Sequence, residues 1–294
     1  MRLPYLLNPV YRAARRLSPE AVKPALRGYY NSLNKLATYG RSDIFTALDI
    51  ETNSRCNLKC TYCAVARYDR GDHFMTEEMF RKIIDDLVAF PFEYKGRISP
   101  HFYGDPLIDK RLPSLMAYVR EKLPKSSIII HTNAVALTKE LFHDLIDAGT
   151  DGLVITKHMA YWPKVVQELV EDDKSKKYIT LQLLDNVGIF ERGGTVPVNK
   201  AHKFKCCYYV SDEIAVDYAG NVVCTNDFFV RHPFGNVAEQ SLAEIWWDPE
   251  FVQTRHDLRR GKMNLKMCRE ICGDDPIDWT EIPNDTCNKD ITHW

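Results

Sequence analysis

The sequence predicts an α/β protein with a partial, TIM-like (β/α) barrel, followed by a smaller cysteine-rich unit. Strand-like and helix-like segments alternate between residues 44 and 184, which is typical of parallel βαβ units. More than four such units follow one another, and this favours a barrel or partial barrel over a flat sheet. The alternation stops near residue 195, and six of the nine cysteines lie beyond that point.

Each element of the barrel has a local signal. The strands are expected at residues 44–51, 97–103, 127–132, 153–156 and 178–184. The helices are expected at residues 76–90, 113–123, 138–149 and 163–170. Thr76 and Thr138 are suitable N-caps, and Gly149 is a suitable helix end. Glu77 and Glu78 fall in a first turn, where the helix dipole favours acidic side chains.

We expect three parts: a basic N-terminal arm over residues 1–42, the barrel over 43–195 and the cysteine-rich unit over 196–294. The arm contains eight Lys or Arg residues and one acid, and its apolar spacing predicts a short amphipathic helix. We expect it to pack on the body; contact with a membrane surface is the weaker alternative, because no lipidation motif accompanies it. The last part predicts a hairpin at 212–224, helices between 242 and about 259, and a tail with little secondary structure.

Composition excludes several classes of protein. The net charge of −1 argues against a dedicated nucleic-acid binder. The sequence shows no secretory signal and no apolar run long enough to span a bilayer. Nine cysteines are many for such a chain, and a chain of this size does not need a disulfide scaffold. The cysteines are therefore interpreted as metal ligands in a reducing compartment, the cytoplasm.

Three cysteines follow the first strand at the spacing Cys56-x3-Cys60-x2-Cys63. Thiolates are soft ligands that suit iron–sulfur clusters or zinc. Three thiolates on one short loop can bind three irons of a [4Fe–4S] cube and leave the fourth iron open to a small molecule. The alternative is a zinc knuckle with a distant fourth ligand, although zinc loops prefer pairs of cysteines.

This spacing, with the aromatic Tyr62 before the third cysteine, resembles the radical S-adenosylmethionine (SAM) superfamily. The resemblance implies that the open iron binds the amino acid end of SAM. It also implies that the reduced cluster cleaves SAM, and that the resulting 5′-deoxyadenosyl radical takes a hydrogen atom from the substrate. A flavodoxin or ferredoxin is the expected electron donor.

Further SAM contacts are expected after the next three strands. Gly104-Asp105 resembles the Gly-Glu segment that binds the SAM amino group in this superfamily, and a plain Gly-Asp-Pro turn is the alternative. A carboxylate at this place would hold an ammonium group through charge-assisted hydrogen bonds. Four residues at the ends of strands three and four are candidates for the SAM ribose or carboxylate, or are ordinary loop residues: Thr132, Asn133, Thr156 and His158.

The later cysteines resemble the SPASM/twitch extension of radical SAM enzymes, which carries auxiliary iron–sulfur clusters. Six cysteines are too few for two auxiliary clusters, so one [4Fe–4S] cluster is expected here in addition to the first. Its expected ligands are Cys207, Cys224, Cys268 and Cys272, with Cys206 as the alternative to Cys207. Cys287 is expected to be a free thiol, and a structural zinc site is the alternative for the whole group.

Asp49 and Arg192 are the candidates for catalysis. Asp49 and Glu51 share one face of the first strand, and such inward acids are costly unless they bind substrate hydroxyls or pair with a basic residue. Arg192 lies in an Arg-Gly-Gly segment that resembles radical SAM dehydrogenases of cyclitols, in which the matching arginine contacts the substrate. Arginine is a poor base, so we expect Arg192 to orient the substrate and stabilise charge.

The resemblance implies an oxidoreductase that oxidises an alcohol of a sugar or cyclitol to a ketone and passes one electron to the auxiliary cluster. Two alternatives remain open at this point. Related SPASM enzymes modify peptides by epimerisation or crosslinking, and a zinc-stabilised binding module would have no enzymatic role.

Overall fold

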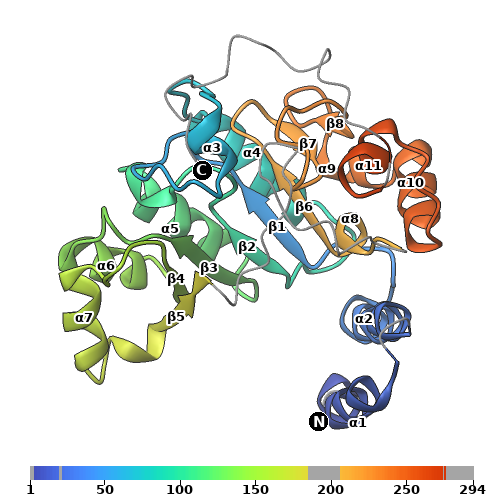
Figure 1. Cartoon of the computed structure of the whole chain (residues 1–294), viewed down its shortest axis with the longest axis horizontal. Helices are drawn as coiled ribbons and strands as arrows, with labels where there is room; N and C mark the ends of the chain where they lie inside the picture. The colour runs from blue at the N-terminus through green and yellow to red at the C-terminus, as the bar shows by residue number, and fades with distance from the viewer. Residues whose placement is uncertain (1–2, 20–21, 185–205, 274, 276–294) are drawn as a thin grey trace.

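One eight-stranded sheet organises the molecule (Figure 1). The computed structural model describes residues 3–19, 22–184, 206–273 and 275. The strand order is β5-β4-β3-β2-β1-β6-β7-β8. The strands are β1 Ala47–Ile50, β2 Arg97–Ser99, β3 Ser127–Thr132, β4 Gly152–Lys157, β5 Ile179–Leu183, β6 Glu213–Val216, β7 Asn221–Val223 and β8 Gly235–Asn236.

The sheet is an open barrel. All neighbouring pairs from β5 to β6 are parallel, and β7 and β8 add an antiparallel edge. Among the described residues the outermost strands, β5 and β8, do not pair with each other. The predicted α/β fold with a partial barrel is therefore confirmed. β1 is central: Ala47 lies opposite Arg97 of β2 on one side and opposite Glu213 of β6 on the other.

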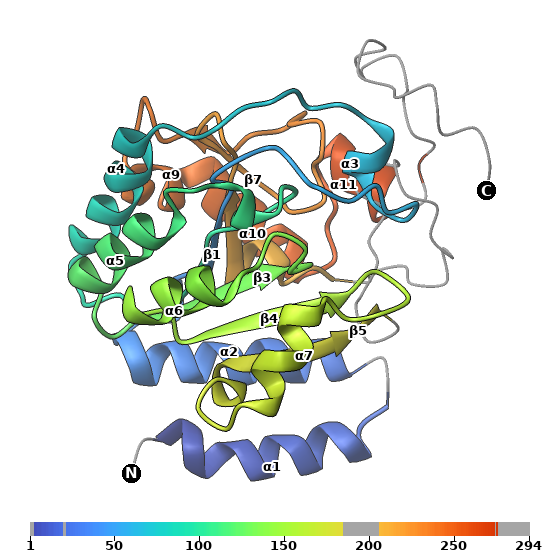
Figure 2. The ribbon, with the colours of Figure 1, turned by 90° about the vertical axis from the view of Figure 1, so that its left-hand side faces the viewer.

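Helices follow the strands and cover the outer face of the sheet (Figure 2). The barrel helices are α3 Ala64–Arg67, α4 Glu77–Val88, α5 Leu112–Lys122, α6 Lys139–Asp147 and α7 Lys164–Glu171. The later helices are α8 Tyr209–Asp212, α9 Leu242–Trp246, α10 Pro249–Arg259 and α11 Lys266–Ile271. Short 3-10 helices are η1 Pro106–Ile108 and η2 Lys176–Tyr178.

Local chemistry explains the barrel elements. The hydroxyl groups of Thr76 and Thr138 accept hydrogen bonds from the first turns of α4 and α6, as expected of N-caps. On β3, Ile128 and Ile130 are fully buried in the core, so the alternating His131 faces the barrel interior. The same alternation on β1 buries Leu48 and Ile50 in the core and turns Asp49 inward, as predicted.

Three parts of the chain differ from the sequence-based prediction. The N-terminal arm forms two helices, α1 Leu3–Leu17 and α2 Lys23–Tyr39, instead of one short helix. A proline in the first turn favours the start of α2, and Gly40 ends it at a φ of 70°. β2 stops at Ser99 because Pro100 has no N–H for the ladder. The tail contains helix α11, which the sequence analysis missed because it spans less than two turns.

No helix among the described residues combines the length and the apolar character that a membrane crossing requires.

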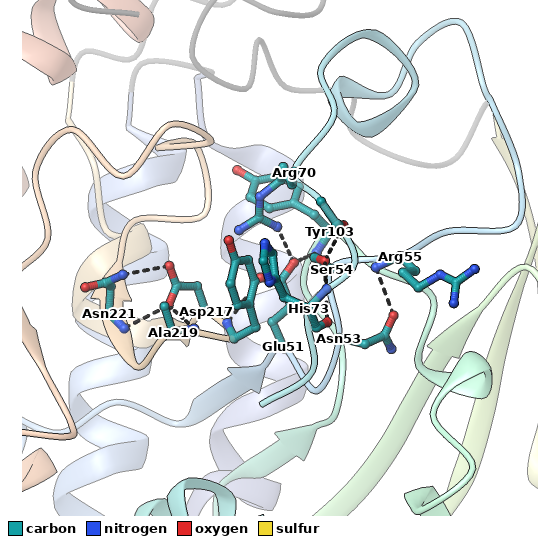
Figure 3. Close-up of polar contacts among 12 residues, drawn as sticks. Glu51, Asn53, Ser54, Arg55, Arg70, His73, Tyr103, Asp217, Ala219 and Asn221 are labelled. Carbon is teal, nitrogen blue, oxygen red and sulfur yellow. Dashed lines mark hydrogen bonds and ion pairs between the residues drawn. The ribbon is translucent and has the colours of Figure 1, made fainter. Parts of the chain in front are cut away.

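A buried ion pair joins β1 to three other segments (Figure 3). Glu51, directly after β1, is fully buried and pairs with Arg70, which lies on the segment that returns from the cysteine loop. The backbone N–H groups of Tyr103 and Tyr218 donate to the two Glu51 carboxylate oxygens at 3.2 and 3.3 Å. The carboxylate therefore fixes the segment after β2 and the β6–β7 turn to the end of β1.

Arg70 is held by aromatic rings as well as by Glu51. Its guanidinium lies over the rings of Tyr103, Tyr218 and Phe228, at 5.0, 5.2 and 5.5 Å from their centres. Burial alone would lower the pKa of Arg70, but the Glu51 carboxylate reverses this and raises it above its ordinary value. Burial also raises the pKa of Glu51, and the Arg70 charge opposes this rise. The close ion pair and the two N–H groups that donate to the Glu51 carboxylate favour its ionised form, so each partner depends on the other for its burial.

We predict that Glu51→Gln is strongly destabilising, because it leaves the Arg70 charge buried without its partner. The expected loss is about 3–5 kcal/mol in the free energy of unfolding, measured by urea titration. The matched control is Glu77→Gln, which removes an ion pair with Arg81 that is about two-fifths exposed on each side. We expect the control to change stability little. Equal effects of the two substitutions would contradict this role of Glu51.

Candidate functional site

The cysteine loop is fixed by hydrogen bonds at its start (Figure 3). The Asn53 side chain accepts a hydrogen bond from the backbone N–H of Arg55 at 2.9 Å. The Ser54 hydroxyl donates to the Gly71 carbonyl at 2.8 Å, and the Ser54 N–H donates to the His73 carbonyl at 2.9 Å. The loop therefore leaves β1 and returns along a defined path, with Cys56, Cys60 and Cys63 between these anchors.

All three cysteines of the loop line one cavity of 280 Å³, at the ends of the parallel strands where barrel active sites lie. Every residue predicted for SAM binding lines the same cavity: Tyr62, Gly104, Asp105, Thr132, Asn133, Thr156 and His158. The other lining residues are Leu58, Ala64, His101, Phe102, Tyr103, His131, Gln182 and Leu184. The structure thus brings together residues that lie on five separate segments of the sequence.

Gly104 allows the segment after β2 to pack directly on the cysteine loop. A Cβ atom at this position would lie 2.1 Å from the carbonyl oxygen of Asn53 and 2.8 Å from that of Arg55. The next residue, Asp105, donates its backbone N–H to the Arg55 carbonyl at 2.7 Å. A larger residue than glycine would therefore push the cysteine loop away from the cavity wall.

The Asp105 carboxylate links the end of β2 to the end of β3. It accepts hydrogen bonds from the Thr132 hydroxyl, at 2.9 and 3.0 Å, and from the backbone N–H groups of Asn133 and Leu107, at 2.9 and 3.0 Å. Burial raises the pKa of Asp105, and these hydrogen bonds oppose the rise. The Gly-Asp motif predicts a ligand ammonium group as a partner of Asp105, and the structure adds these protein partners.

Two contacts connect the cysteine loop to the other strands. The Tyr62 hydroxyl lies 2.8 Å from Nδ1 of His158, which follows β4. The Asn133 amide lies 3.7 Å from the sulfur of Cys56 and donates to the Asn57 side chain at 2.8 Å. These contacts close the cavity on two sides of the three thiols.

The donor set fits an iron–sulfur cluster. Burial, with the charges of the neighbouring thiols, raises the pKa of Cys56 to about 11 and also raises that of Cys60. Three thiolates in this cavity therefore need cations close by, which the irons of a cluster supply. Zinc loops prefer pairs of cysteines, whereas three cysteines lie on this one loop, so one zinc ion is the poorer fit.

The sequence analysis missed a histidine pair in the cavity wall. The rings of His101 and His131 stack with their centres 4.5 Å apart, and both line the cavity. The Arg97 guanidinium lies 3.3 Å from His131 Nε2, 3.2 Å from Asp49 and 3.3 Å from Glu213. Asp49 is thus paired with Arg97 and does not itself line the cavity. Strand alternation against Ile128 and Ile130 was the signal that could have identified His131.

The second group of cysteines lines another cavity, of 410 Å³. Cys206 and Cys207 precede α8, Cys224 follows β7, and Cys268 and Cys272 lie on α11 and at its end. All five were expected near one another, and the structure brings them together.

The pKa shifts of the buried thiols bear on which of the adjacent cysteines, Cys206 or Cys207, belongs with the other three. Burial raises the pKa of Cys224 well above its usual value, and that of Cys268 to about 12. In both cases the charges of Cys207 and Cys272 contribute to the rise. Cys207, Cys224 and Cys272 also pack against the hydrophobic core that includes Cys268. Cys207 therefore lies within the group formed by Cys224, Cys268 and Cys272.

Two predicted residues lie outside the described residues. Arg192 falls in the range 185–205 and Cys287 in the range 276–294. Their roles stay predictions.

We predict that His131 makes stability depend on pH. Burial, together with the Arg97 charge, lowers the pKa of His131 from its usual 6.5 to about 4. Between these values the unfolded chain binds more protons than the folded chain, so stability falls as pH falls through this window. The contribution is at most roughly 3 kcal/mol.

Urea unfolding near pH 7.5 and pH 5.5 checks this prediction, with His131→Gln expected to flatten the pH dependence. The exposed His143 provides the matched control, and His143→Gln should keep the wild-type dependence. An unchanged pH dependence in His131→Gln would refute it.

Comparison with known protein families agrees with this geometry. The model of the radical SAM superfamily matches residues 50–181, which include the cysteine loop and all residues that line the first cavity except Gln182 and Leu184. The model of the SPASM iron–sulfur cluster-binding domain matches residues 206–273, which include the five cysteines of the second cavity.

One curated relative matches most of the chain, and another matches about a third of it. The S-adenosyl-L-methionine-dependent 2-deoxy-scyllo-inosamine dehydrogenase of Niallia circulans is 32% identical over 241 residues, which are 78% of this chain and 94% of that protein. A tungsten-containing aldehyde ferredoxin oxidoreductase cofactor-modifying protein of Pyrococcus furiosus is 31% identical over 35% of this chain and 28% of its own length.

A solved structure shares the fold. The crystal structure of BtrN in complex with AdoMet and 2-DOIA superposes with a TM-score of 0.70 at 26% identity, covering 79% of this chain and 92% of BtrN. The long match to the Niallia circulans protein establishes the family and confirms the resemblance seen in the motifs. The chain therefore belongs to the radical SAM superfamily, as an enzyme that uses S-adenosylmethionine and carries iron–sulfur clusters in a barrel and a following SPASM domain.

Proposed function

We propose that this chain is a radical SAM dehydrogenase that oxidises a secondary alcohol of a small hydroxylated ring compound, an aminocyclitol or a sugar, to a ketone. The observation that carries this proposal is the match to an aminocyclitol dehydrogenase along 94% of that protein's length. Such a match includes both the barrel and the auxiliary region, whereas relatives with other activities match a smaller part of the chain.

The first cavity is the proposed SAM site. A cluster and SAM bound there would supply a 5′-deoxyadenosyl radical, which would take one hydrogen atom from the carbinol carbon. Loss of the hydroxyl proton to solvent and of one electron to the auxiliary cluster would then complete the two-electron oxidation to the ketone. Cys56, Cys60 and Cys63 would hold the first cluster. The residues proposed to contact SAM are Tyr62, Gly104, Asp105, Thr132, Asn133, Thr156 and His158. The Asp105 carboxylate would act mainly by holding the strand ends in place, because three protein donors already engage it.

The second cavity is the proposed auxiliary [4Fe–4S] site. Its ligands would be Cys207, Cys224, Cys268 and Cys272, and the coupling among these thiols supports Cys207 over Cys206. In this proposal Cys206 and Cys287 are free thiols, and the chain binds two [4Fe–4S] clusters in total.

The histidine pair is the proposed wall of the substrate site. The lowered pKa of His131 makes its ring neutral at physiological pH, so it can accept or donate a hydrogen bond to a substrate hydroxyl. Arg97 and Asp49 would orient this ring. Asp49 would thus act through Arg97 and not on the substrate directly, and Arg192 is proposed to orient the hydroxyl from the other side.

The proposal includes a domain division and a cellular setting. Residues 43–195 would form the SAM-binding unit and residues 196–294 the auxiliary-cluster unit, although β6 joins the sheet of the barrel.

Oxygen-sensitive thiolate clusters need reducing surroundings, which supports the cytoplasm. A flavodoxin or ferredoxin would supply the electron that starts each turnover.

The activity can be tested with the anaerobically reconstituted enzyme, SAM, a chemical reductant and a panel of aminocyclitols and sugars. We expect equal amounts of 5′-deoxyadenosine and ketone. Deuterium at the oxidised carbon should appear in 5′-deoxyadenosine, as detected by mass spectrometry. Turnover of a peptide but of no ring alcohol would overturn the proposal in favour of peptide modification.

We predict about eight irons per chain in the wild type and about four in a Cys56/Cys60/Cys63→Ala variant, because each cubic cluster contains four. Cys207→Ala should lose most of the auxiliary iron. Its matched control is the adjacent Cys206→Ala, which should keep it. Iron and sulfide assays measure both. An iron loss in Cys206→Ala alone would reverse the ligand assignment.

A further inference from the structure

The two helices of the N-terminal arm, α1 Leu3–Leu17 and α2 Lys23–Tyr39, lie outside both family matches and yet border the second cavity. They form a hairpin in which the rings of Tyr11 and Tyr30 stack 4.0 Å apart. In Figure 1 helix α2 lies between α1 and α8, and Figure 2 shows α1 as the outer helix.

Helix α2 is anchored on the segment that follows Cys207. The buried Lys35 ammonium donates to the Ser211 carbonyl at 2.7 Å and to the Asp212 carboxylate at 2.6 Å. The Asn31 amide donates to the other oxygen of Asp212 at 2.7 Å. Gly28 faces the Tyr208 ring so closely that a Cβ atom would lie 2.0 Å from it. The arm is therefore attached to the wall of the second cavity.

The arm adds positive charge at this cavity. Arg15, Lys23 and Arg27 line it together with the five cysteines. Two acids also line it, but Asp212 is paired with Lys35 and Glu213 with Arg97. The remaining basic side chains of α1, Arg12 and Arg16, are exposed, as are Arg15 and Arg27. We call these four exposed arginines the arginine patch.

We propose that the arginine patch is the docking surface for an acidic one-electron carrier protein of the flavodoxin or ferredoxin class, which takes an electron from the auxiliary site. The inference rests on the proposed function, in which each turnover leaves one electron at that site. The carrier is reduced by one electron as the auxiliary site is reoxidised, and no proton or group is transferred.

Charge and position favour this partner over a membrane. An acidic protein complements the arginine patch, and electron-transfer contacts are small and depend on such charge pairing. A bound carrier would also face the cavity that contains the cysteines. A lipid surface would bind the same positive charge, but its binding would not depend on the position of the arginine patch beside the cysteines.

The test variant is Arg12/Arg15/Arg16/Arg27→Glu in the full-length, reconstituted enzyme, compared with wild type. The matched control reverses four exposed lysines elsewhere: Lys110, Lys164, Lys174 and Lys177→Glu. The probe is an acidic bacterial flavodoxin. Surface plasmon resonance measures its binding, and stopped-flow absorbance measures oxidation of the pre-reduced auxiliary site. Both assays omit the substrate.

At about 50 mM salt, we expect the patch variant to bind flavodoxin at least about 10-fold more weakly than the wild type, and to transfer electrons at least about 10-fold more slowly. Both differences should shrink at about 500 mM salt. The control should match the wild type. The double variant Arg12/Arg16→Glu, which leaves the cavity-lining arginines intact, should lose an intermediate amount of flavodoxin binding and electron transfer. It replaces the fourfold variant in the test if the fourfold variant loses iron. Equal behaviour of the patch variant and the control overturns the proposal.

Binding to vesicles that contain anionic phosphatidylserine tests the membrane alternative. Loss of vesicle binding in the patch variant, with unchanged flavodoxin binding, overturns the proposal in favour of a lipid surface. The dehydrogenase proposal fails separately: patch-dependent electron transfer without ketone formation supports the docking surface and refutes the proposed substrate.

Discussion

The buried pair of Glu51 and Arg70 is the interaction on which the rest of the structure depends. Glu51 is the first residue after the central strand, and its two oxygens hold the segment after β2 and the β6–β7 turn. The pair therefore fixes the cysteine loop relative to the hairpin that leads to Cys224. Burying a charged pair away from solvent costs stability, because both charges lose their hydration. The buried pair also allows few alternative arrangements of the chain. This suits a loop that must hold three thiols in a fixed geometry.

The cavity is built by contacts between strand ends and not by the strands themselves. Gly104 lets the segment after β2 touch the backbone before Cys56, and the Asp105 carboxylate ties that segment to Thr132 and Asn133. Tyr62 reaches His158 after β4. Each of these residues connects two neighbouring loops, so a substitution at one of them changes the position of several others. This arrangement explains how loops of different length can form one rigid wall.

Much of the molecule could be predicted because the signals are local. The spacing of Cys56, Cys60 and Cys63 fixes which thiols can reach one cluster, and β3 was located within its observed bounds from β-branched residues alone. The capping residues Thr76 and Thr138 act within one turn of their own helices. Errors arose where tertiary contacts decide: α2 is stabilised by packing on Tyr208 and by Asp212, which lie far away in the sequence.

The sequence by itself determined the chemistry that this protein brings to its cavities: two groups of thiols and a barrel of parallel strands. Covalent spacing and side-chain periodicity encode these features within short segments. Only the tertiary structure decided which partners the inward acids take, Arg97 for Asp49 and Arg70 for Glu51, and that His101 stacks on His131. It also placed the basic arm beside the second group of cysteines. These pairings join residues from separate elements, so their formation depends on the packing of the whole sheet and on no local pattern.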